Sequence, residues 1–275
     1  MGIFPAISHG DLGVFALGLV IAGAVSGLAA GVLGIGGGIV VVPVLYHVMA
    51  ALGIAPGVRM HVAIATSLAA VVPAALAHAQ NSKNAINWPV ILDFAAPLVG
   101  GVALGCAAAA PADGRVLAFL FALVALPIIF HLVLGERRTV AATPPCKNTA
   151  LIVASLCAFA SVLTGITPDT IRMSVPGVRV IDDGRERATA SVLALVVAAA
   201  GAIALGIAGW NARDLPPDSF GYVNLLGFAL IAPVLLATEP AGAALAHMID
   251  VRRLRLVFAC LIAIATARML WDVFV

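Results

Sequence analysis

The sequence predicts an all-α integral membrane protein with about eight transmembrane helices, arranged as two related four-helix repeats with broken or re-entrant half-helices. Three observations predict this fold class. The 275-residue chain is 63% hydrophobic and only 10% charged, against roughly 25% charged residues in soluble domains. Long apolar runs recur along the whole chain, as bilayer-spanning helices require. Finally, a glycine-rich segment interrupts one of these runs in the first half.

Eight apolar runs approach or exceed the length of about 20 residues that a spanning helix needs. They cover residues 12–33, 60–80, 88–110, 115–135, 148–166, 188–210, 221–247 and 254–274. The residues before the first run lack the basic n-region of a signal peptide, so this run is expected to be a retained helix. Four aromatic residues lie at run ends, where amphipathic rings favour the headgroup layer. They are Trp88, Trp210, Tyr222 and Trp271.

The first run ends in GVLGIGGGIVVVP, residues 31–43, which is apolar but unusually rich in glycine. Glycine permits backbone angles that other residues avoid, so this segment is expected to break a helix at membrane depth. Such a break is tolerated only inside the protein or beside a water-filled cavity, where its amides can meet a solute. The alternative is close packing of two helices through small residues. The candidate binding glycines are Gly34, Gly36, Gly37 and Gly38.

Residues 39–53 after the break are too few to cross a bilayer, so they are expected to form a half-helix. Whether this segment crosses decides the topology. If it does not cross, most arginines gather on one side, which places both termini outside. If it crosses, the positive charges are distributed more evenly.

The chain divides near its middle at a polar, proline-bearing loop. We expect a first transmembrane repeat at 1–135, an inter-repeat loop at 136–148 and a second repeat at 149–275. Three pairs of segments match weakly in the same order, which favours duplication and a substrate site between the repeats. They are 41–45 with 173–178, 64–72 with 187–197, and 115–126 with 253–264.

Motifs of the first half resemble the sulfite exporter TauE/SafE family of membrane anion transporters, within the toluene sulfonate uptake permease superfamily. They are GVLGIGGGIVVVP at 31–43, HVAIATSL at 61–68, NAINWPVIL at 84–92, and Gly100 with Gly101. The resemblance implies a two-repeat permease for sulfite, sulfoacetate or related organic anions. The second half departs from the family pattern, because TGITPDTIRMSVP at 164–176 replaces the repeated glycine cluster with polar and charged residues.

Asp169 and Arg172 lie in this replacement element, where the first repeat has its break. Charged residues in a bilayer are costly and mark pathways, relays or ion pairs. The Arg172 guanidinium matches the oxygens of a sulfonate or carboxylate, and Asp169 can orient it or exchange a proton. The alternative is a structural ion pair at the membrane interface.

Paired hydroxyls are the next candidates, because they can donate hydrogen bonds to a dehydrated anion. The first repeat offers Thr66 and Ser67, and the second offers Thr189 and Ser191 at the matching place. Hydroxyls in spanning helices also bond their own i−4 carbonyl or a neighbouring helix, which is the competing structural role.

Two residues are the main candidates for coupling transport to a proton. His61 begins the 60–80 run, and Asp93 lies in the 88–110 run. An imidazole titrates near neutral pH, and an intramembrane carboxylate can relay a proton. Hydrogen-bonded packing or a helix-fixing ion pair is the alternative for each. Three further residues require the same test, namely His47, Glu239 and Arg268.

These observations predict a secondary transporter, in the exporting direction, of sulfite, organosulfonates or related small anions across the cytoplasmic (inner) membrane. A proton or the membrane potential would drive it by alternating access. An anion channel and a non-transporting accessory protein are the alternatives. No enzyme is expected, because HExxH, GxSxG and Walker A patterns are missing from the sequence. The four cysteines form no ligand spacing and the net charge is only +2, so no metal, cofactor or nucleic acid is expected. The oligomeric state stays open.

Overall fold

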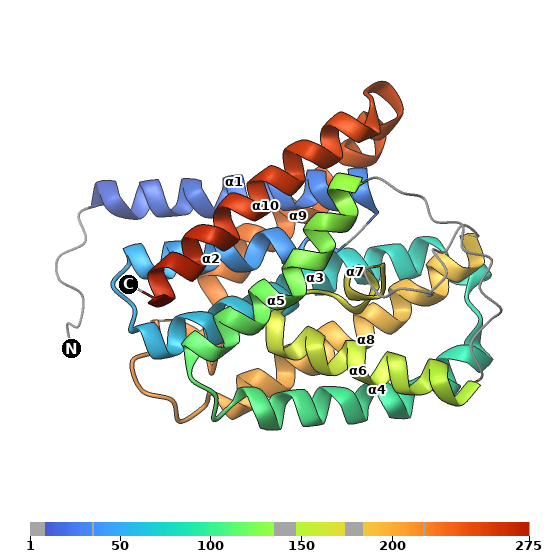
Figure 1. Cartoon of the computed structure of the whole chain (residues 1–275), viewed down its shortest axis with the longest axis horizontal. Coiled ribbons are helices and arrows are strands. Elements are labelled where there is room, and N and C mark those ends of the chain that lie inside the picture. Colours follow the sequence, from blue (N-terminus) through green and yellow to red (C-terminus); the bar gives the residue numbers. More distant parts are fainter. Residues whose placement is uncertain (1–8, 35, 135–146, 174–183, 217, 275) are drawn as a thin grey trace.

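The structure is a computed structural model that describes residues 9–34, 36–134, 147–173, 184–216 and 218–274. These residues form ten α-helices, one 3-10 turn and one short hairpin (Figure 1). The first half contains α1 (His9–Leu33), α2 (Gly38–Ala51), α3 (Pro56–Asn81), η1 (Lys83–Ala85), α4 (Trp88–Ala109) and α5 (Gly114–Leu134). The second contains α6 (Lys147–Thr164), α7 (Pro168–Met173), α8 (Gly184–Ala208), β1 (Ser219–Phe220), β2 (Val223–Asn224), α9 (Leu225–Met248) and α10 (Val251–Phe274).

Seven of the described helices are long and apolar enough to cross a membrane, namely α1, α3, α4, α5, α8, α9 and α10. The remaining predicted run, 148–166, forms α6, whose apolar segment is slightly shorter. α2 is a further short apolar helix. The prediction of an all-α integral membrane protein is therefore confirmed.

Helices of the two halves pack in corresponding pairs. α1 lies along α9, and α6 lies along α4 in the same way. Both pairs approach closely through glycines, because a Cβ on Gly27 would lie 2.4 Å from the Leu235 carbonyl oxygen and one on Gly101 would lie 2.3 Å from the Ser155 carbonyl oxygen. Figure 1 shows that α1 and its counterpart α6 run in opposite directions, as α3 and α8 do. Two helices of the second half thus run antiparallel to helices of the first.

The half-helix predicted at 39–53 is α2, which has 14 residues and is therefore about 21 Å long. That length falls short of the roughly 30 Å hydrocarbon layer. Figure 1 nevertheless shows α2 returning toward the end of the molecule from which α1 starts. α2 is therefore a short helix that reverses the direction of α1, as the half-helix prediction expects.

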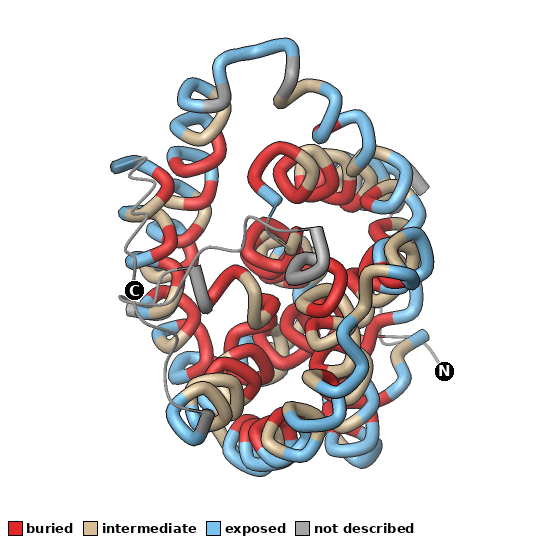
Figure 2. The backbone as a smooth tube through the Cα atoms, turned by 90° about the vertical axis from the view of Figure 1, so that its right-hand side faces the viewer, coloured by how far each residue is buried: buried red, intermediate tan, exposed pale blue. Residues whose placement is uncertain are grey.

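The core centres on α3, 72% of which is buried, and α3 packs against α2, α8 and α9. Figure 2 shows buried backbone facing the inside of the bundle and exposed backbone around its periphery. The peripheral side chains include many large apolar ones, such as Leu92, Leu104 and Ile264. An apolar outer surface of this kind matches contact with lipid chains rather than water. Trp88, Trp210 and Trp271 are also exposed, as expected of interfacial anchors.

Candidate functional site

Each half contains one helix break, and the two breaks have the same backbone form. α1 ends at Leu33 and is followed by Gly34 at φ 65°, while α6 ends at Thr164 and is followed by Gly165 at φ 72°. The N–H of Gly34 donates to the Ala30 carbonyl at 2.8 Å, and that of Gly165 donates to Ser161 at 2.7 Å. Left-handed glycines end helices because they carry no Cβ. The polar 164–176 element therefore contains a break although its glycine cluster is missing.

The two breaks lie against each other at the centre of the bundle. The buried Ser67 hydroxyl of α3 lies 3.2 Å from the Gly165 carbonyl oxygen and 3.5 Å from that of Gly38, and donates to them. On the opposite side, a Cβ on Gly36 would lie 2.1 Å from Thr167 Oγ1. The segments 34–38 and 164–168 thus form one junction with Ser67 between them.

The second break is lined by hydroxyls where the first has glycines. Ser161, Thr164, Thr167 and Thr170 are all buried. Ser161 donates to the Ile166 carbonyl, Thr164 donates to the Ala160 carbonyl at 2.8 Å, and the Thr167 and Thr170 oxygens lie 3.0 Å apart. These bonds hold the short segment between α6 and α7 in place.

Ser26 of α1 is a junction residue that the sequence analysis missed. It is fully buried, and its hydroxyl has no hydrogen-bond partner within the described part of the chain. Its Cβ lies 3.2 Å from the place a Cβ on Gly37 would occupy. An unpaired buried hydroxyl costs free energy and is available to a ligand. A lone serine in an apolar run, two turns before the break, was the only signal in the sequence.

Thr66 and Thr189 make equivalent bonds, but these bonds lead away from the breaks. Thr66 accepts the backbone N–H of Asn224 at 2.9 Å, and Thr189 accepts that of Asn87 at 3.1 Å. Asn224 and Asn87 are the N-cap residues of α9 and α4. Each threonine therefore holds a helix start of the opposite half. Ser191 lies half-buried on α8.

Asp169 lies in the first turn of α7 and is half-buried. The backbone of Arg172 belongs to the same helix, but its side chain lies outside the described residues. α7 itself begins at Pro168, directly after the hydroxyl-lined segment of the second break. The predicted pairing of these two charges stays a prediction.

His61, the first coupling candidate, is buried at the start of α3. Its Nδ1 lies 3.1 Å from the Gly57 carbonyl oxygen and its Nε2 lies 2.9 Å from that of Ala109, the last residue of α4. The ring stacks on Tyr222 with a centroid separation of 4.7 Å. Tyr222 differs from the three exposed tryptophans predicted as anchors, because its ring packs on His61 and is buried. Burial raises the pKa of the Tyr222 phenol, which keeps this ring neutral.

Asp93, the second coupling candidate, is exposed in the second turn of α4. Glu239 lies much further along the corresponding helix α9, where its carboxylate is 2.8 Å from His78 Nε2. The two acids therefore occupy corresponding helices at different depths. Glu239 thus pairs with a histidine, as a helix-fixing ion pair would.

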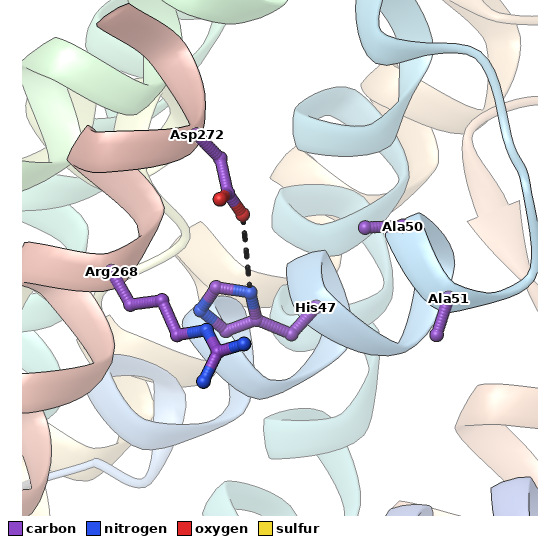
Figure 3. A pocket seen from close by; sticks show the side chains of 5 residues that line it. All are labelled: His47, Ala50, Ala51, Arg268 and Asp272. Carbon is purple, nitrogen blue, oxygen red and sulfur yellow. Dashed lines mark ion pairs between the residues drawn. The ribbon is translucent and has the colours of Figure 1, made fainter. Parts of the chain in front are cut away.

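A pocket of about 410 Å³ opens between α2 and α10, lined by His47, Ala50, Ala51, Arg268 and Asp272 (Figure 3). His47 Nδ1 lies 3.6 Å from Asp272 Oδ2, and His47 Nε2 lies 3.3 Å from the Ala265 carbonyl oxygen. The sequence flagged His47 and Arg268 separately. It gave no sign that they meet, because they come from different halves of the chain.

Comparison with known proteins agrees with a membrane protein built from apolar helices. The profile described as Sulfite exporter TauE/SafE matches residues 19–269, nearly the whole chain. The chain belongs to the TauE/SafE family. It is also similar to a probable membrane transporter protein of Haemophilus influenzae, with 23% identity over 258 residues that cover 93% of this chain and 98% of the relative. No solved structure matches the chain. Membership of the family makes the protein a multi-pass membrane transporter that faces the lipid bilayer and carries a small solute.

Proposed function

We propose that this protein is a secondary transporter that exports sulfite, organosulfonates or related small organic anions across the cytoplasmic membrane by alternating access. The observation that carries the proposal is the junction at which the two helix breaks meet around the Ser67 hydroxyl. In this proposal the substrate binds there, and the membership of the TauE/SafE family supports the substrate class.

The start of α2 supplies the groups that an oxyanion needs. Gly37 is the N-cap of α2 and offers no side-chain hydrogen bond to the first turn. The backbone N–H groups of a helix start carry about half a positive elementary charge and bind anions. Ser67 and Ser26 place buried hydroxyls beside the same segment. The helix-start amides and Ser26 can donate to the anion directly, whereas Ser67 would turn its one hydroxyl proton from the Gly165 and Gly38 carbonyls to the anion.

We infer from the opposite directions of α1 and α6, and of α3 and α8, that the two halves are inverted repeats, and this relation supports alternating access. In transporters with inverted repeats, substrate binds where discontinuous helices meet, and one repeat rocks against the other. Here the close contacts of Gly36 with Thr167 and of Gly38 with Gly165 lie on that boundary. Rocking would separate them and admit the anion. Such tight packing supports a transporter over the anion-channel alternative, which needs a continuous wetted path.

The test is anion efflux from liposomes that contain the purified protein and are loaded with sulfite, sulfoacetate or methanesulfonate. We expect concentration-dependent, saturable efflux that falls about 10- to 100-fold in Ser67→Ala, since a hydrogen bond to an ion contributes about 1.5 to 3 kcal/mol. Ser155→Ala is the matched control, because Ser155 is a half-buried serine of α6 and takes no part in the junction bonds.

Three results would count against the proposal. Voltage-driven single-channel currents would favour the channel, and efflux of none of these anions would favour the accessory role. Equal efflux in wild type and Ser67→Ala would remove the junction as the binding site.

A further inference from the structure

The pocket between α2 and α10 lies at the opposite end of α2 from the glycine break, and the proposed junction site does not use it. We propose that it is a second binding site, for a small oxyanion that Arg268 holds when His47 is protonated. The proposal rests on the proposed function, because it makes this pocket the place where proton and anion binding are linked.

His47 has two acceptor oxygens on α10, one for each ring nitrogen. Nδ1 faces the Asp272 carboxylate at 3.6 Å and Nε2 faces the Ala265 carbonyl at 3.3 Å. A neutral imidazole carries only one N–H, so one of these oxygens then faces a nitrogen lone pair. The imidazolium donates to both. The pocket therefore has a defined place for one proton, on the second ring nitrogen of His47.

Arg268 supplies the positive charge for the anion. It lies one helical turn before Asp272 on α10, and Figure 3 shows it extending from α10 toward α2 beside His47. Within the described part of the chain, its guanidinium has no ion-pair or hydrogen-bond partner. A guanidinium matches the paired oxygens of a sulfonate, carboxylate or phosphate. The oxyanion is the partner that this side chain lacks.

The charge of the pocket depends on His47. With neutral His47, the charges of Arg268 and Asp272 cancel, and protonation of His47 leaves a net charge of +1. The other charged groups near this end of α2 are Arg59 of α3 and Arg115 of α5, which act on the adjacent Tyr46. Both are positive and also attract an anion. The described side chains of α1 carry no charge.

The position of the pocket links it to the junction. His47 lies nine residues after Gly38 on α2, a distance of about 13.5 Å along the helix axis. A bound anion and a protonated His47 both fix α2 against α10. Because α2 begins at the break, an anion bound in the pocket restricts the movement of α2 and thereby the opening of the junction.

Calorimetric titration of the detergent-purified protein with methanesulfonate tests this inference. This probe remains a monoanion across the pH range in which histidine titrates. We expect about tenfold tighter binding at about pH 5.5 than at about pH 8. Arg268→Gln should lose this pH-dependent binding, and His47→Gln should bind equally weakly at both pH values. Asp272→Asn should bind at the higher pH as tightly as wild type does at the lower, because it leaves Arg268 uncompensated. Arg253→Gln is the control, since Arg253 is an exposed arginine at the other end of α10.

Wild-type binding in Arg268→Gln, or an unchanged pH dependence in His47→Gln, would overturn the proposal.

Nanodiscs with phosphatidylglycerol or phosphatidylcholine separate two sources of the oxyanion. Competition by phosphatidylglycerol alone would assign the site to a lipid headgroup, and no competition would assign it to a soluble anion. Gly38→Ala should retain the pH-dependent binding while losing efflux. Binding without any efflux in wild type would therefore reject the proposed function alone.

Discussion

The two helix breaks both begin at a left-handed glycine but continue with different residues. The first break consists almost entirely of glycines, whereas the second has one glycine at φ 72° among buried hydroxyls. The difference is complementary, because Thr167 of the second break occupies the space that a side chain on Gly36 would need. A second glycine cluster is therefore not required for a symmetric junction. One side supplies space and exposed backbone, and the other supplies side chains that fill the space.

This complementarity gives a physical reason for the departure of the second half from the family pattern. The sequence predicted a substrate element at 164–176 without its glycine cluster, and the structure places a helix break there at Gly165. The substitution of threonines for glycines is matched by contacts in the opposite half. A substitution in one helix break should therefore act on stability and transport through the contacts that it makes with the other break.

The largest expected effect comes from the left-handed glycines. Gly165→Ala should reduce the free energy of unfolding by about 2 to 4 kcal/mol, because the left-handed conformation and overpacking both contribute. Its Cβ would lie 2.7 Å from Val42 Cγ2 and 3.1 Å from the Ile64 Cα. Gly34→Ala should cost only about 1 kcal/mol, since nothing lies within 4 Å of its Cβ. Denaturant unfolding in detergent measures both values, and equal losses would show that the two breaks are packed alike.

The next effect concerns the contact between the breaks. Gly38→Ala should lower the free energy of unfolding by about 1 to 3 kcal/mol through overpacking and should abolish efflux. Its Cβ would lie 2.4 Å from the Gly165 carbonyl oxygen, a backbone atom that no rotamer change can move. Gly100→Ala in α4 is the matched control, because nothing lies within 4 Å of that Cβ. Full efflux in Gly38→Ala would place the transport route elsewhere.

The sequence predicted the elements of the fold better than the contacts of the site. All eight apolar runs became helices with similar bounds, because length and hydropathy are local properties. The break at Gly34 and the half-helix after it could also be predicted from the sequence, since glycine density is a local property. The partners of Ser67, Thr66 and His47 were not, because they lie 98, 158 and 218 residues away in the chain. Only the packing of the two halves against each other brings these groups together.

The smallest expected effect compares the two threonines that hold a helix start of the opposite half. Thr66→Val removes the acceptor of the Asn224 N–H, a residue that is only 4% exposed. An unpaired buried donor costs about 1 to 3 kcal/mol. Thr189→Val removes the acceptor of the Asn87 N–H, but Asn87 is exposed, so water can replace the hydroxyl and the cost should fall to about 0.5 kcal/mol. Thermal unfolding of the two variants in the same detergent measures the difference. Equal losses of stability in the two variants would mean that the two helix starts are equally closed to water. The two halves would then be more alike at these helix starts than at their breaks.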